Sequence, residues 1–163
     1  MTALTMRELT EWVERTATGW RALIAQHPEV LSFPCDIRET NSVGELIQHI
    51  VAVQLRYAER LNGLAETSYD DIPHGSGEEI FAIHDRSIAL LKDLPPWSEE
   101  DWEVGLAFST RSAGVLKASR RTVFVHLLMH SIRHYAQLAT IVRHNGVKPD
   151  WGMDYLLMVA TSA

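Results

Sequence analysis

The chain has 163 residues, of which 46% are hydrophobic and 22% charged, and its formal net charge is −6. This size fits one globular domain with a single core, so we expect residues 1–163 to form one domain. The acidic balance argues against a nucleic-acid partner, because a site for a phosphate backbone needs a basic face.

The cysteine content and the hydropathy of the sequence indicate in which cellular compartment the protein is expected. Cys35 is the only cysteine, so no disulfide can form within the chain, and the simplest expectation is a cytoplasmic protein. The chain has no run of about 18 apolar residues, so we expect no membrane span.

The first two helices have clear start and stop signals. Apolar residues recur at three- and four-residue spacing over 5–26, and Pro28 ends this helix because the residue before a proline avoids the helical region. A second helix begins at Ser42, which has the capping-box spacing to Glu45, and ends at an Asn-Gly pair at 62–63.

The second half of the chain predicts two more long helices. A third helix spans 78–94, where a Pro-Pro pair stops it, and a fourth spans 118–144 before another Asn-Gly pair. Between them, residues 97–117 fit either a short extended pair or an ordered loop that covers the bundle. A short last helix runs to about residue 160. The pattern predicts an all-α four-helix bundle with a short C-terminal helix.

The fourth helix carries the most informative motif, three histidines at intervals of four residues: His126, His130 and His134. Each step of four turns a helical side chain by about 40°, so the three lie on one face. Neighbouring members are about 6 Å apart along the axis, the spacing at which two imidazoles can bind one metal ion. The outer two are about 12 Å apart, so one ion cannot bind all three, and a third ligand must come from another helix.

His49 is the best candidate for that third ligand. It is the only histidine of the second helix and lies at the edge of its apolar stripe. A lone histidine in such a place is more often a hydrogen-bonded helix residue than a ligand. Beside a histidine pair on another helix, however, three buried imidazoles without a metal would need several partners or lowered pKa values. The sequence therefore predicts a metal site of His49, His130 and His134.

Three imidazoles leave coordination positions open, which is typical of a catalytic metal site. They suit zinc, nickel and iron alike, so we expect a divalent ion of one of these kinds. His126 can be a fourth ligand, a group behind the ligands or a general base, although a packing role is the simpler interpretation. Glu45 can orient His49 or only cap its helix, and Gln137 can line the same site.

These residues and the motifs around them resemble the DinB/YfiT-like superfamily of small metal-binding four-helix bundles. The resemblance rests on His49, on His130-x3-His134 followed by Tyr135-Ala136-Gln137, on the end of the fourth helix, and on Pro149-x-Trp151-x-x-Asp154-Tyr155. Tyr135 and Ala136 stand where Arg and Gly are common in the family, while Gln137 matches.

The resemblance implies a divalent metal held by three histidines, here His49, His130 and His134, and frequent homodimers. Characterised relatives include transferases and isomerases that use a low-molecular-weight thiol. The leading hypothesis is a metal-dependent thiol S-transferase acting on a small-molecule substrate, in which the metal favours the thiolate and His126 or a metal-bound water accepts the proton. The alternatives are a metal-dependent hydrolase that uses metal-bound water, and a non-enzymatic metal-containing stress-response or binding module.

Overall fold

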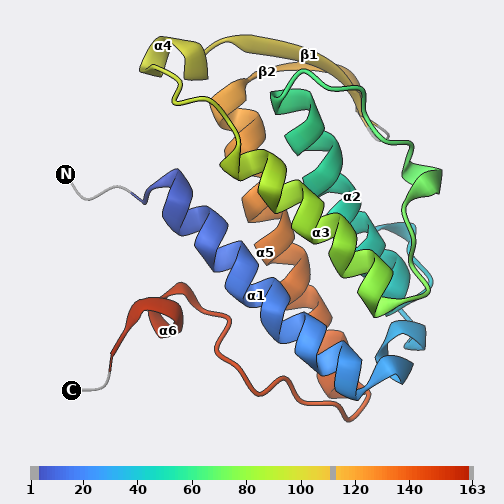
Figure 1. The fold of residues 1–163 in the computed structure, drawn as a ribbon. Helices are drawn as coiled ribbons and strands as arrows, with labels where there is room; N and C mark the ends of the chain where they lie inside the picture. The colour runs from blue at the N-terminus through green and yellow to red at the C-terminus, as the bar shows by residue number, and fades with distance from the viewer. Residues whose placement is uncertain (1–3, 111–112, 162–163) are drawn as a thin grey trace.

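Four long helices packed side by side dominate the computed structural model, which describes residues 4–110 and 113–161 (Figure 1). The helices and strands follow in this order: α1 Met6–Gln26, α2 Val43–Leu61, α3 Gly77–Lys92, α4 Glu99–Trp102, β1 Gly105–Thr110, β2 Gly114–Ser119, α5 Arg120–His144 and α6 Tyr155–Val159. Short 3-10 turns lie at Pro28–Ser32, Ile37–Glu39 and Tyr69–Asp71. The predicted all-α bundle is confirmed. Within the described part of the chain, no helix has the length and apolar character needed to cross a membrane.

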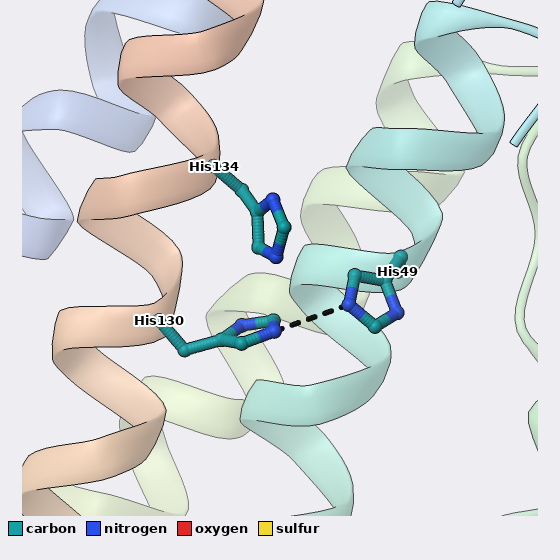
Figure 2. A group of neighbouring side chains, drawn as sticks. All are labelled: His49, His130 and His134. Carbon is teal, nitrogen blue, oxygen red and sulfur yellow. Dashed lines mark hydrogen bonds between the residues drawn. The ribbon is translucent and has the colours of Figure 1, made fainter. Parts of the chain in front are cut away.

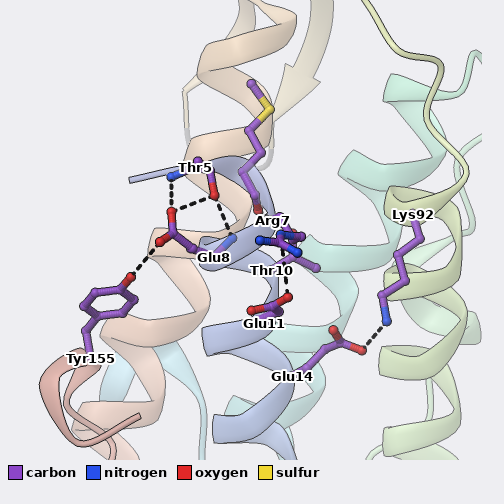
Figure 3. Close-up of polar contacts among 9 residues, drawn as sticks. Thr5, Arg7, Glu8, Thr10, Glu11, Glu14, Lys92 and Tyr155 are labelled. Atoms are coloured by element: carbon purple, nitrogen blue, oxygen red, sulfur yellow. Dashed lines mark hydrogen bonds and ion pairs between the residues drawn. The ribbon is translucent and has the colours of Figure 1, made fainter. Parts of the chain in front are cut away.

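Local capping signals decide where the first two helices begin. The Thr5 hydroxyl accepts a hydrogen bond from the N–H of Glu8, and the Glu8 carboxylate accepts one from the N–H of Thr5 in return (Figure 3). Ser42 caps α2 by accepting from the N–H of Glu45. The Glu45 carboxylate instead accepts from the N–H of Asn41 at 2.8 Å. In the predicted capping box of α2, the first hydrogen bond is thus present. The second comes from the N–H of Asn41, the residue before the cap, and not from that of Ser42.

Apolar packing around α2 sets the arrangement of the bundle. α2 lies against both α3 and α5, and its inward side chains are fully buried. One core cluster gathers around Trp20 and Tyr135, whose rings stack at 6.1 Å, and a second gathers around Phe124 and Leu127. The histidine stripe of α5 starts beside the second cluster and ends beside the first, so apolar packing on both sides holds it in place.

Within 97–117, the described residues form α4 and most of an antiparallel strand pair, so the extended-pair interpretation is the right one; residues 111–112 lie outside the described part. Leu106 and Phe108 of β1 are half-buried and pack on the second core cluster. The guanidinium of Arg60 lies 4.1 Å from the ring centroid of Phe108 and 4.6 Å from that of Tyr57. This stacking fixes the hairpin over one end of α2.

The chain that follows α5 turns back and runs along α1 to α6 (Figure 1). Trp151 packs directly on Gly19 of α1: a Cβ atom at that glycine would lie 2.2 Å from Trp151 Cε2, so a side chain there would displace the indole. Further on, the Tyr155 hydroxyl donates a 3.3 Å hydrogen bond to the Glu8 carboxylate (Figure 3). Trp151 and Tyr155 therefore both help to hold the returning segment against α1.

Candidate metal centre

α5 turns two of its three motif histidines toward the bundle interior. His130 and His134 keep only 8% and 1% of their surface exposed, whereas His126 is exposed. Successive members of a four-residue stripe turn by about 40°, so one end of the stripe drifts out of the helix contact. As a result, His126 is exposed and the other two histidines are buried, although all three share one face of the helix.

His49 reaches the same place from α2. Its ring centroid lies 4.9 Å from that of His130 and 5.1 Å from that of His134. The Nε2 atoms of His49 and His130 are 3.1 Å apart and share a hydrogen bond, and the three rings point toward one another (Figure 2). The three histidines singled out from the sequence therefore converge at one point between α2 and α5.

The spacing of the ring nitrogens suits a metal ion. One nitrogen from each of the three histidines lies within 4.8 Å of the other two. Nitrogens bound to a tetrahedral zinc at 2.0–2.1 Å are about 3.4 Å apart, so small rotations of the side chains would close the site. The group contains no carboxylate and no thiolate. The donor set is thus three neutral nitrogens, which leaves positions for other ligands.

Burial and mutual repulsion keep His130 and His134 in the neutral form. Burial, followed by the charges of His134 and His49, lowers the pKa of His130 to about 2. Burial also lowers the pKa of His134 to about 4, although its hydrogen bond to Gln137 acts in the opposite direction. A histidine must be neutral to bind a metal, so both residues are ready to do so at neutral pH.

Gln137 sets which nitrogen of His134 is available. His134 Nδ1 lies 2.6 Å from Gln137 Oε1, and because an amide oxygen only accepts, Nδ1 carries the proton and Nε2 keeps its lone pair. The Arg133 guanidinium donates to that Nε2 at 3.1 Å. His130 Nδ1 is buried and has no hydrogen-bond partner among the described residues. The cluster is therefore a buried polar site whose hydrogen bonding is incomplete.

A second buried polar group lies directly behind the cluster. Gln54 Nε2 donates to Ser131 Oγ at 2.9 Å, and Gln54 Oε1 accepts from His84 Nδ1 at 2.8 Å. Ser131 donates in turn to the carbonyl of Leu127. These bonds join α2, α3 and α5 next to His130. The sequence analysis did not single out Gln54 or Ser131; the available signal was a polar residue within the buried stripe of each helix.

The other candidate residues take different places. The His126 ring lies 5.5 Å from that of His130 and 5.7 Å from that of Tyr57, outside the three-histidine group. Glu45 makes the capping contacts with Asn41 described above, which account for its position. The sequence analysis missed Arg133, although a cation directly before a candidate ligand was a visible signal.

Comparison with known proteins identifies the family of this chain. The family model described as the DinB superfamily matches residues 31–138, about two thirds of the chain, and this span includes His49, His130 and His134. No curated protein matches the sequence closely enough to count as a relative. The match, the helical bundle and the three converging histidines agree with one another, and the chain belongs to the DinB superfamily.

Proposed function

We propose that this protein binds one divalent metal ion through His49, His130 and His134 and acts as a metal-dependent thiol S-transferase. The observation that carries the proposal is the convergence of three imidazoles from α2 and α5, with ligand nitrogens within 4.8 Å of one another. Zinc, nickel and iron all accept such a donor set.

In this proposal, each residue of the site would have a separate role. A bound metal ion lowers the pKa of a coordinated thiol, so that the thiolate is available as a nucleophile near neutral pH. The three histidines hold the ion and leave positions open for the thiol. Gln137 keeps His134 in the tautomer that presents Nε2. His126, exposed beside His130, is placed to accept the proton that the thiol releases.

Elemental analysis of the purified protein tests the ligand set. We expect about one divalent ion per chain in the parent and its loss in His49→Ala, His130→Ala and His134→Ala. His144→Ala is the matched control, because His144 is an exposed histidine in the last turn of the same helix. Metal that is retained in the three variants, or absent from the parent after expression with added metal, would contradict the ligand set.

Turnover assays test the activity once metal is present. We expect the metal-loaded protein to transfer a low-molecular-weight thiol to a member of a panel of electrophiles, and His126→Ala to lower the rate while keeping the metal. Turnover of esters or amides without thiol would indicate the hydrolase instead. Stoichiometric metal with no turnover in either panel would indicate a non-enzymatic binding module.

A further inference from the structure

Two exposed arginines whose charges act on the histidine cluster have no balancing carboxylate among the described residues. The Arg133 guanidinium donates to His134 Nε2 at 3.1 Å, the nitrogen that Gln137 leaves free. The positive charge of Arg38 also acts on His134, lowering its pKa. Among the described residues, neither arginine forms an ion pair with an aspartate or glutamate, so their charge is available to a ligand.

Several cations elsewhere on the bundle do form ion pairs. Arg56 and Arg60 both pair with Glu66, and Arg121 pairs with Glu99 and Glu103. Arg86 pairs with the buried Glu59, and Lys92 with Glu14 (Figure 3). In a chain with a net charge of −6, carboxylates are plentiful. Arg133 differs from these cations because its guanidinium bonds to a nitrogen of the histidine cluster and not to a carboxylate.

The backbone around Arg38 is held in an unusual conformation. Arg38 and Glu39 have φ angles of 57° and 62°, in the left-handed region that residues with a Cβ atom rarely adopt. Two such residues in succession cost of order 1–3 kcal/mol each, and conformations of this kind concentrate at ligand-binding and active sites. The loop before α2 thus holds Arg38 in a strained turn.

The charge at the site would be strongly positive once a metal is bound. Three neutral imidazoles add no negative charge to a divalent ion, and the ligand group contains no carboxylate. A bound ion would use the lone pair of His134 Nε2, so Arg133 would lose its present acceptor and be free to contact another group at the site. A guanidinium binds a carboxylate with two parallel hydrogen bonds, a geometry that an exposed arginine can adopt at little cost.

We infer that this site takes a ligand bearing a carboxylate, which binds beside the metal with its negative charge on Arg133 and within the field of Arg38. The inference rests on the proposed metal site and specifies its substrate class. The carboxylate can belong to the thiol or to the second reactant, and in both cases Arg133 contacts it directly. Arg38 then contributes mainly through its charge.

Isothermal titration of the zinc-loaded protein with three small probes tests this inference. Mercaptoacetate and 2-mercaptoethanol are thiols of similar size that differ by a carboxylate, and propionate carries the carboxylate without the thiol. We expect mercaptoacetate to bind about tenfold more tightly than 2-mercaptoethanol, the value of one exposed charged hydrogen-bond pair. Arg133→Gln should abolish this preference and leave 2-mercaptoethanol binding unchanged.

Further variants sharpen the result. Arg133→Lys should keep part of the preference and Arg38→Gln should reduce it, whereas Arg143→Gln, an exposed arginine near the end of α5, should not change it. If propionate also binds and its binding depends on Arg133, the carboxylate can belong to either reactant. If only mercaptoacetate binds, the carboxylate belongs to the thiol.

Three results would overturn the inference: equal affinity for the two thiols, an equal loss for both in Arg133→Gln, or no binding of any probe. Metal content measured after each titration separates these from failure of the proposed function, which would appear as protein that holds no zinc at all.

Discussion

Two buried histidine sites lie close together in this bundle, joined through Gln54 and Ser131, and they differ in how their polar atoms are hydrogen-bonded. His84 is 4% exposed, and its Nδ1 donates to Gln54, which donates in turn to Ser131. His130 is 8% exposed, faces two other imidazoles and has an unpartnered Nδ1 among the described residues. A completed network stabilises the packing of helices, whereas an incomplete cluster of donors is suited to a ligand. Burial alone would not distinguish the two.

Metal addition should produce the largest difference between the two sites. A ligand that binds only the folded state stabilises it by about 4 kcal/mol at a thousandfold excess over its dissociation constant. We expect this gain in urea unfolding of the parent and of His84→Leu, and no gain in His130→Ala. An equal gain in His130→Ala would mean that the ion binds elsewhere.

Acid should destabilise the metal-free protein next most strongly. Burial lowers the pKa of His84 to about 4, mainly through desolvation, while the unfolded chain keeps the usual value of 6.5. The unfolded state therefore binds more protons, so the stability is fully present above pH 6.5 and falls as the pH drops toward 4. We expect His84 alone to account for a loss of about 2.5 kcal/mol between pH 7 and 4.5, measured by urea unfolding.

The same experiment on His84→Leu separates the two sites. This variant should lose part of the acid sensitivity, because His84 no longer titrates, and His130 and His134 should account for what remains. Identical pH profiles for the parent and His84→Leu would show that His84 is protonated equally in both states.

His84→Leu at neutral pH breaks the completed network while leaving the metal ligands in place. It removes the donor to Gln54 Oε1 and leaves a buried acceptor unpaired, which costs about 2 kcal/mol. We expect the free energy of unfolding to fall by that amount, with an unchanged metal stoichiometry. Metal lost from this variant would mean that the two sites depend on each other.

Gln137→Leu should have the smallest effect and should act on the metal site alone. Removing the acceptor of His134 Nδ1–H frees the ring to rotate and to exchange tautomers. We expect metal affinity to fall about tenfold, measured by competition with a chelator. Gln137→Glu, which retains an acceptor, should keep the parent affinity or exceed it. Equal affinity in all three proteins would assign Gln137 a surface role only.

Signals between near neighbours in the chain were enough to predict most of the fold. The predicted spans of the four long helices agree with α1, α2, α3 and α5 to within two residues at each end, because caps, prolines and Asn-Gly pairs act locally. The hairpin of β1 and β2 was open to two interpretations. Its pairing depends on the contact of Phe108 with Arg60 and Tyr57, residues far away in sequence.

The sequence by itself determined the pair His130 and His134, since a four-residue interval on a helix places two side chains one turn apart whatever surrounds them. Only the tertiary structure decided that His49 joins them and that His84 forms a hydrogen bond with Gln54. It also decided that the charge of Arg38 acts on the site. These outcomes depend on the rotation and register of α2 and α3 against α5. That geometry is set by how apolar side chains of all the helices pack together, and no local stretch of sequence contains it.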